Sequence, residues 1–230
     1  MRGFTVATRH GCILAIAVVL SAFVSRGVQA ANLRGVVTIV ERGGAPGDPS
    51  DAFVWIEGAP GPPPPPGRAS ITMRNKTFEP AIVQLPVGSR LTFPNADPIL
   101  HNVFSVSGGN RFDLGLYPRG PGRDVVLREP GVVRIFCNVH PQMEAFVVVT
   151  PGSFAARPAA DGRFTIPDLP AGRYTVRIWH ERGGADERVV EIGADGSAAV
   201  EFTLDATSWR RRPHLDKDGR PYQASARDAY

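Results

Sequence analysis

Short runs of β-branched and aromatic residues recur along most of the chain, and most are bounded by Gly, Pro, Asn or Asp. Residues 35–40 and 53–56 form the first two runs. Runs of this length and composition favour β-strands, and no stretch keeps the 3.6-residue period of an amphipathic helix. The pattern therefore predicts an all-β protein. Further strands are expected at 82–85, 90–93, 101–106, 124–127, 132–136, 145–149, 163–166, 174–179, 189–192 and 199–204.

A proline-rich segment at residues 61–68 interrupts this strand pattern, and it contains five consecutive prolines at 62–66. Consecutive prolines favour a stiff polyproline II conformation and supply no N–H donors to a sheet. We interpret the segment as a linker between domains, with a docking motif as the alternative. A second domain junction is expected near residues 150–152, where the sequence is Thr-Pro-Gly.

The first thirty residues have the features of a secretory signal peptide. Arg2 and Arg9 precede a 14-residue apolar run at 11–24, and residues 28–30 end it with a small-x-small cleavage pattern. The apolar run is shorter than the roughly 20 residues that span a bilayer, so an uncleaved membrane anchor is the weaker alternative. We predict cleavage after Ala30 and a periplasmic or secreted product, with no membrane span after cleavage.

Removal of this leader changes the charge and the cysteine count. The full sequence carries 26 Lys and Arg against 22 Asp and Glu, a net charge of +4. The leader contains three of the arginines and no acidic residue. A basic polar tail at 206–230 contains more Lys and Arg than Asp and Glu, and it accounts for the rest of the positive charge. The body is then slightly acidic, which argues against nucleic-acid binding. Cys137 is the cysteine that remains, and in an oxidising compartment it pairs between chains, stays buried or binds a ligand.

One group of residues carries candidate chemistry. Cys137, His140 and Met143 follow at three-residue intervals between two predicted strands, and His101 begins another strand 36 residues upstream of Cys137. Two imidazoles and a thiolate, with a weakly bound thioether, form the donor set of a blue-copper electron-transfer site. Taken singly, each residue also has an ordinary interpretation, such as a buried thiol or a packed methionine. We favour copper because the four donors occur together in one pattern.

The sequence around these donors resembles the cupredoxins over about residues 69–150. The loop 137–143 (CNVHPQM) has the compressed ligand spacing of amicyanin-like proteins, and residues 87–103 are similar to the run that leads to the first histidine ligand in amicyanin and plastocyanin. The resemblance implies a Greek-key β-sandwich that binds one type 1 copper ion. The ligands that it implies are His101, Cys137, His140 and Met143.

The same resemblance implies roles for residues next to the ligands. Asn102 is expected to tie the two ligand loops together by hydrogen bonds, which would hold the ligand orientation. Pro141 has no N–H and so cannot donate a hydrogen bond near the thiolate. The edge of His140 is the implied electron port. The apolar docking patch expected around this port comprises Pro98, Ile99, Leu100 and Pro141.

The flanking segments resemble a second family, the carboxypeptidase regulatory-like (transthyretin-like) β-sandwich. Residues 161–174 are similar to its usual second half and residues 33–56 to its usual opening. We predict that the cupredoxin at 69–150 is inserted into this sandwich, whose parts are 31–60 and 151–205, because the C-terminal part alone would form a marginal core. The alternative is a cupredoxin with an extra N-terminal hairpin and a separate C-terminal domain.

As a whole, the chain resembles the exported plastocyanin-like proteins that are often labelled methylamine utilization proteins, a label that establishes no pathway. We predict a non-enzymatic carrier of single electrons, with an exported partner such as a c-type cytochrome or a dehydrogenase. The alternatives are a copper module for delivery, storage or sensing, and a binding role for the transthyretin-like part. An enzyme is disfavoured for three reasons. The sequence has none of the His-x-His pairs of a multicopper oxidase, and after cleavage the chain lacks the second thiolate of a binuclear copper centre. No group that would orient a Cys137–His140 nucleophilic pair is evident. His180 and His214 are expected at the surface or in the tail.

Overall fold

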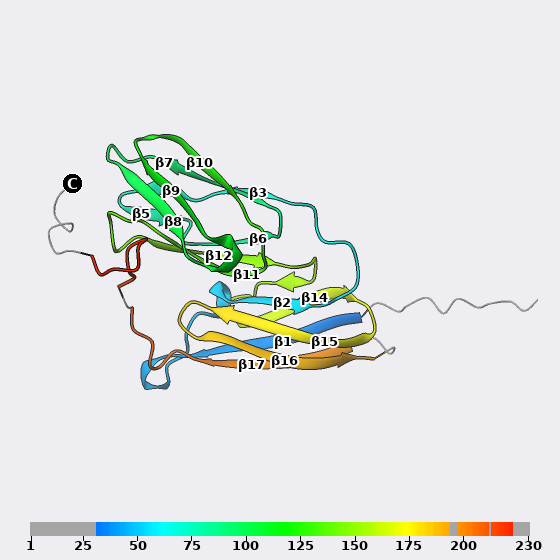
Figure 1. The fold of residues 1–230 in the computed structure, drawn as a ribbon. Coiled ribbons are helices and arrows are strands. Elements are labelled where there is room, and N and C mark those ends of the chain that lie inside the picture. The colour runs from blue at the N-terminus through cyan, green and yellow to red at the C-terminus, as the bar shows by residue number, and fades with distance from the viewer. Residues whose placement is uncertain (1–30, 194–196, 212, 223–230) are drawn as a thin grey trace, which may run out of the picture.

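The computed structural model describes residues 31–193, 197–211 and 213–222, so the predicted signal peptide lies outside the described residues. Regular structure in the described part consists of strands and three short 3₁₀ turns, Arg42–Gly44, Pro49–Asp51 and Gly108–Asn110. The prediction of an all-β protein is confirmed. Figure 1 shows the strands arranged in two stacked β-sandwiches. In the described ranges, no helix has the length and apolar character needed to cross a membrane.

The first sandwich combines strands from both ends of the described chain. Its strands are β1 (Ala31–Val40), β2 (Phe53–Glu57), β13 (Ala155–Ala156), β14 (Arg163–Leu169), β15 (Gly172–His180), β16 (Gly184–Ile192) and β17 (Ser197–Asp205). One sheet has the order β14-β1-β17, in which β1 pairs antiparallel with β14 and parallel with β17. The other sheet has the order β13-β2-β15-β16. Both N-terminal strands therefore lie inside sheets whose other strands come from the C-terminal part.

The alternation of side chains along β1 explains how this sandwich closes. Leu33, Val37 and Ile39 are at most 2% exposed, whereas Arg34 and Thr38 face solvent. The buried face packs in one core with alternate residues of β2, β14, β15, β16 and β17. Burial of apolar side chains on both inner faces is what holds the two sheets together.

The second sandwich occupies the chain between β2 and β13. Its strands are β3 (Arg68–Ser70), β4 (Thr72–Arg74), β5 (Thr77–Glu79), β6 (Ile82–Pro86), β7 (Arg90–Asn95), β8 (His101–Ser105), β9 (Phe112–Tyr117), β10 (Gly120–Val126), β11 (Gly131–Phe136) and β12 (Glu144–Thr150). One sheet has the order β10-β7-β4-β5, with β3 beside β7, and the other has the order β6-β12-β11-β8-β9. Leu91 and Phe93 from the first sheet meet Val133 and Ile135 from the second in a fully buried core.

The two sandwiches touch through a small apolar cluster. Phe53 and Trp55 of β2 are buried against Val148 of β12. The ring of Phe146, also on β12, lies 5.1 Å from the ring of Trp179, centroid to centroid. Strand β12 therefore belongs to the core of the second sandwich on one face and to this inter-sandwich contact on the other.

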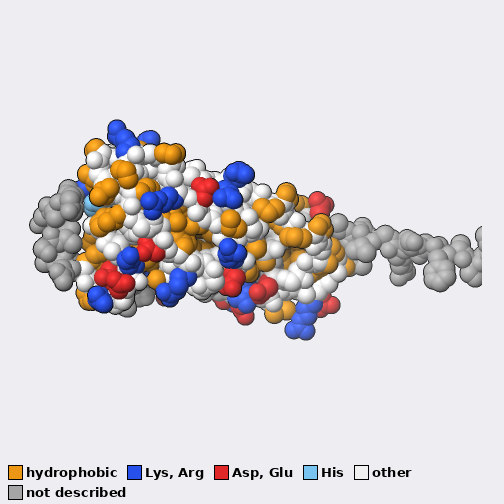
Figure 2. Space-filling model, turned by 45° about the horizontal axis from the view of Figure 1, so that its top comes forward, with side chains coloured by type: hydrophobic (Ala, Val, Ile, Leu, Met, Phe, Trp, Pro, Cys, Tyr) orange, Lys and Arg blue, Asp and Glu red, His pale blue; other side chains and the backbone are white. Residues whose placement is uncertain are grey.

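The surface carries mixed charges. Figure 2 shows Lys and Arg side chains interspersed with Asp and Glu over the face in view, with hydrophobic side chains between them. Ion pairs such as Arg177 with Glu57 and Glu187 join neighbouring strands on the outside of the first sandwich.

The strand pairing bears on the predicted insertion of one domain into the other. β1 and β2 pair with strands between residues 155 and 205, and the whole second sandwich lies between them in the sequence. This arrangement supports an insertion. The domain boundaries at residues 60, 68, 150 and 205 stay predictions.

We expect a chain that begins at residue 61 to lose the fold of residues 151–205. β1 is the central strand of its sheet, so its removal leaves β14 and β17 without a shared partner and exposes the apolar core. Amide hydrogen exchange of residues 163–205 should be fast in the truncated chain and slow in the full chain. Slow exchange in both chains would show that residues 151–205 fold alone, and the insertion would be wrong.

Candidate metal centre

Strand pairing brings the predicted donors to one end of the second sandwich. β11 is flanked by β12 and β8, and its last residue, Phe136, pairs with Glu144 of β12 and Phe104 of β8. Cys137 follows directly after β11, the loop 137–143 leads into β12, and His101 is the first residue of β8. The donors therefore lie beside one another because neighbouring strands end or begin at the same end of the sheet.

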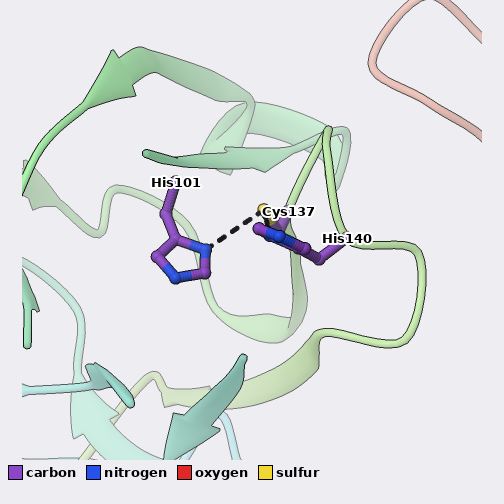
Figure 3. Close-up of side chains that lie close together, drawn as sticks. All are labelled: His101, Cys137 and His140. Atoms are coloured by element: carbon purple, nitrogen blue, oxygen red, sulfur yellow. Dashed lines mark hydrogen bonds between the residues drawn. The ribbon is translucent and has the colours of Figure 1, made fainter. Parts of the chain in front are cut away.

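Three of the predicted donors form a compact buried group (Figure 3). The Cys137 Sγ atom lies 3.8 Å from His101 Nδ1 and 3.5 Å from His140 Nδ1. All three donor atoms lie within 4.8 Å of one another. The exposed fractions of His101, Cys137 and His140 are 0%, 0% and 6%. The structure thus places two imidazole nitrogens and one sulfur around a point that water does not reach.

The fourth predicted donor lies at the base of the same loop. Met143 is 1% exposed and belongs to the same apolar core as Cys137. Its amide donates a hydrogen bond to the His140 carbonyl at 2.9 Å, and its carbonyl accepts one from the Cys137 amide at 3.4 Å. These backbone bonds close the loop so that residues 137, 140 and 143 share one compact turn.

Burial shifts the pKa values of two donors in ways that matter for metal binding. Burial raises the pKa of the Cys137 thiol, and backbone amides of Val139, Asn102 and His140 partly oppose this by interacting with the sulfur. Burial, together with the nearby His101, lowers the pKa of His140 to about 4. His140 is therefore neutral at neutral pH, as a metal ligand must be, whereas metal binding has to displace the thiol proton.

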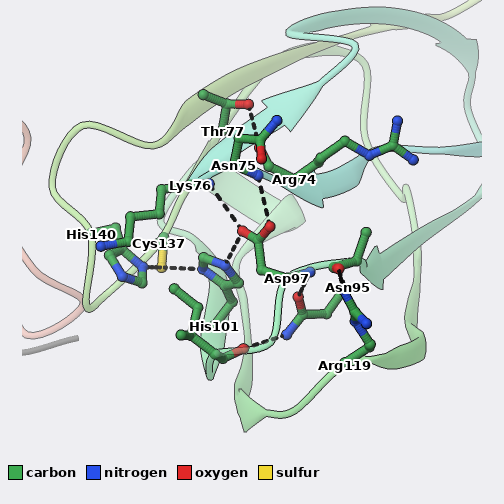
Figure 4. A network of polar contacts seen from close by, with 12 residues as sticks. Arg74, Asn75, Lys76, Thr77, Asn95, Asp97, His101, Arg119, Cys137 and His140 are labelled. Carbon is green, nitrogen blue, oxygen red and sulfur yellow. Dashed lines mark hydrogen bonds and ion pairs between the residues drawn. The ribbon is translucent and has the colours of Figure 1, made fainter.

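Asp97 fixes the orientation of His101, a role that the sequence patterns did not reveal. Its Oδ2 atom lies 2.8 Å from His101 Nε2, and this carboxylate also accepts hydrogen bonds from the amides of Asn75, at 2.7 Å, and Lys76, at 2.9 Å (Figure 4). Burial alone would raise the pKa of Asp97, but the hydrogen bonds from Lys76, His101 and Asn75 lower it below its ordinary value. An ionised carboxylate can only accept, so Nε2 of His101 donates this hydrogen bond, and Nδ1 is the ring nitrogen that faces Cys137.

The amides that Asp97 accepts belong to a tight turn. Asn75 and Lys76 link β4 to β5 and have φ angles of 53° and 56°. Positive φ at both central residues is the conformation of a two-residue type I′ hairpin, and it is unfavourable for a residue such as Lys. Hydrogen bonds to Asp97 thus hold the hairpin in this conformation and attach it to the donor group.

Asn102 lies where the family resemblance implied. Its Oδ1 atom accepts a hydrogen bond from the amide of Asn138 at 3.3 Å, and its Nδ2 donates to Asp113 Oδ1 at 2.6 Å. Asn102 follows His101 and Asn138 follows Cys137, so this contact joins the two donor-bearing segments. Sequence reasoning gave Asn138 and Asp113 no role.

The residues of the predicted docking patch differ in exposure. Pro98 and Leu100 are exposed, Leu100 at 49%, and Ile99 and Pro141 are partly exposed. The predicted port, His140, is buried, and its Nε2 atom has no hydrogen-bond partner in the described part of the chain. The proposed port is therefore buried, and two residues of the predicted patch are exposed.

Of the two histidines expected at the surface or in the tail, one departs from the expectation. His180 is 2% exposed, so the expectation of a surface residue was wrong. Its Nδ1 atom accepts a hydrogen bond from the Gly183 amide at 3.0 Å, and this bond stabilises the tight turn between β15 and β16. His214 is in the tail but is half-buried against Phe136.

Comparisons with known proteins give a match to one region. No protein-family model and no curated protein matches the chain. A reduced amicyanin variant is 24% identical with a TM-score of 0.33, over 35% of this chain and 80% of its own. A purple cupredoxin from Nitrosopumilus maritimus is 25% identical with a TM-score of 0.32, over 35% of this chain and 98% of its own. Because these TM-scores are low, the likeness does not identify the metal. The identification of the metal therefore rests on the donor atoms.

We expect Asp97→Asn to weaken both the fold around the turn and metal binding. An asparagine keeps one acceptor oxygen but turns an N–H group towards an amide that needs an acceptor, which costs about 1–3 kcal/mol of the free energy of unfolding. Loss of an orienting carboxylate lowers metal affinity by about 10–100-fold. Denaturant unfolding of the metal-free protein and a copper titration measure the two effects.

The matched control is Asp124→Asn, since Asp124 lies in the same sandwich and forms an exposed ion pair with Arg90. It should change neither quantity by more than experimental error, because exposed ion pairs contribute little. Equal effects of the two substitutions would contradict the role given to Asp97.

Proposed function

We propose that this protein is an exported type 1 copper protein that carries single electrons between redox partners. The observation that carries the proposal is the buried group of His101, Cys137 and His140, whose donor atoms converge on one point. Met143 in the same loop would be the weak fourth ligand. Copper bound there would supply reversible one-electron chemistry between Cu(II) and Cu(I).

The spacing of the donors supports binding of one ion. A nitrogen about 2.0 Å and a sulfur about 2.3 Å from the same metal are about 3.3–3.7 Å apart when the angle between them is roughly 100–120°. The distance from the sulfur to His140 Nδ1, 3.5 Å, lies inside this range, and the distance to His101 Nδ1, 3.8 Å, lies just above it. Each sulfur–nitrogen pair is therefore spaced closely enough to share one ion.

The donor types favour copper over other common metals. Thiolate and thioether suit Cu(I), and imidazole suits both Cu(I) and Cu(II). Structural zinc sites instead use four Cys and His ligands, and a thioether is not among them. Calcium and magnesium require oxygen ligands, which the three converging atoms do not supply. A set of two nitrogens, one thiolate and one thioether therefore fits copper best.

The rigidity of the site favours electron transfer over delivery. His101 is held by Asp97, the loop is closed by backbone bonds at residues 140 and 143, and Cys137 is fully buried. A carrier gains from ligands that stay in place in both oxidation states, since little rearrangement then accompanies the electron. A delivery or storage module needs a site from which the ion can leave readily. That alternative becomes the favoured function if the protein holds only Cu(I) and gives no colour.

Docking of a partner would use the apolar patch of Pro98, Ile99, Leu100 and Pro141, which we propose to lie beside His140. Pro98 and Leu100 are exposed, and an apolar surface of modest size suits a short-lived redox encounter. His140 would pass the electron to a partner seated on this patch. We propose an exported redox protein as the partner, a c-type cytochrome or a dehydrogenase, and the periplasm as the compartment. The absence of enzymatic activity stays a prediction.

We expect addition of Cu(II) to give an intense visible absorption band from thiolate-to-copper charge transfer, which bleaches on reduction and returns on oxidation. Cys137→Ser should abolish the band, because the hydroxyl of serine is not a thiolate donor at neutral pH. The full chain with Cu(II) added is measured by absorption spectroscopy, and its fold is checked by circular dichroism.

The matched control is Met73→Leu, which replaces a fully buried methionine of the same core by a residue of similar volume. This variant should keep the band. A colourless wild-type protein, or a Cys137→Ser variant that keeps the colour, would refute the proposed copper site.

A further inference from the structure

The described end of the chain returns from the first sandwich to the candidate metal centre. Residues 213–222, which we call the C-terminal arm, follow the last strand of the first sandwich and lie beside the second (Figure 1). The arm has a turn of its own, in which the Asp216 carboxylate accepts hydrogen bonds from the amides of Asp218 and Arg220. Both hydrogen bonds to Asp216 therefore stay within the arm. The turn that they stabilise places neighbouring groups of the arm beside the metal-ligand loop.

The arm contacts three consecutive residues that include a proposed ligand. The imidazole of His214 stacks on Phe136, with ring centroids 4.1 Å apart and an interplanar angle of 28°. The hydroxyl of Tyr222 donates a hydrogen bond to the carbonyl of Cys137 at 2.9 Å. The amide of Lys217 donates to Asn138 Oδ1 at 2.8 Å. The arm therefore holds Cys137 itself and the residues on both sides of it.

One of these contacts closes a ring of polar interactions through both donor-bearing segments. The Lys217 ammonium pairs with Asp113 Oδ2 at 2.6 Å, and Asp113 Oδ1 accepts from the Asn102 side chain. Asn102 accepts from the amide of Asn138, and Asn138 in turn accepts from the amide of Lys217. The ring passes through the residue after His101 and the residue after Cys137, so the arm is part of what joins the two segments.

The aromatic part of the arm packs as a unit. His214 lies 6.2 Å from Phe104 and 5.2 Å from Tyr222, measured between ring centroids, in addition to its stack on Phe136. Phe104 and Phe136 are 1% and 4% exposed. His214 thus packs against both β8, which begins at His101, and β11, which Cys137 follows directly.

We propose that the C-terminal arm is a positioning element of the metal centre, with Tyr222 and Lys217 as its positioning residues. The arm restrains the Cys137 segment from outside and couples the first sandwich, from which it emerges, to the ligand geometry. The redox consequence rests on the proposed copper function. The restraint on Cys137 does not, and it can be measured in the metal-free protein.

The test in the metal-free protein is amide hydrogen exchange of the full chain carrying Tyr222→Phe. Loss of one hydrogen bond to the Cys137 carbonyl should make local opening easier and speed exchange of the amides of 137–143 by about 5-fold. The matched control is Tyr174→Phe, which removes a hydroxyl that also donates to a backbone carbonyl, that of Pro170, within the first sandwich. Exchange at 137–143 should not change in the control.

The test with copper compares the reduction potential and the thiolate-to-copper band of the same variants. The Tyr222 hydroxyl donates to the backbone carbonyl of the ligand residue Cys137, so its loss removes the positive end of a dipole from that residue and should lower the potential, whereas Tyr174→Phe should leave it unchanged. Lys217→Met, which opens the polar ring at Asp113, should also speed exchange at 137–143.

The outcomes separate the two proposals. Faster exchange in Tyr222→Phe and Lys217→Met supports the positioning role, and it does so even if no copper band exists and the copper function fails. Unchanged exchange in both variants overturns the positioning role, and the copper function stands if the band is present. An unchanged potential in a blue Tyr222→Phe protein overturns only the redox consequence of the restraint.

Discussion

The site depends on one constraint, the antiparallel pairing of β11 with both β8 and β12. Because Phe136 pairs with residues of both neighbours, Cys137 lies beside the start of β8 and opposite the start of β12. His101 and the loop 137–143 can then meet only at this end of the sheet. A shift of one residue in either register would turn a donor to the opposite face, since side chains alternate along a strand. The buried cores of β8, β11 and β12 fix that register.

Around this frame, neighbouring groups determine how well each donor is held. Asp97 uses one carboxylate to orient His101 and to hold the positive-φ turn at 75–76, so the β4–β5 hairpin and the donor group depend on each other. Burial of Cys137 makes its thiolate unfavourable without a metal, and the surrounding amides offset part of that cost. The centre thus suits an ion that binds sulfur strongly, and its buried surroundings exclude water.

Local patterns in the sequence predicted most of the strands and the spacing of Cys137, His140 and Met143, because β-propensity and ligand spacing are local properties. The strands β3, β4, β5, β9 and β13 were missed. The family resemblance supplied the expected contact of Asn102. Asp97, Asn138, Asp113 and the C-terminal arm were not predicted as parts of the site. Their importance comes from contacts between residues far apart in the chain, such as Lys217 with Asn138, and no local pattern reveals such pairs. The burial of His180 was missed for the same reason.

The central claim is that two imidazoles and one thiolate bind a single copper ion in both oxidation states. X-ray absorption spectroscopy at the copper edge of the loaded, full chain tests it most directly. We expect one short copper–sulfur bond and two copper–nitrogen bonds, with the same ligands before and after reduction. A coordination shell of nitrogen and oxygen alone, or a ligand that leaves on reduction, would contradict it.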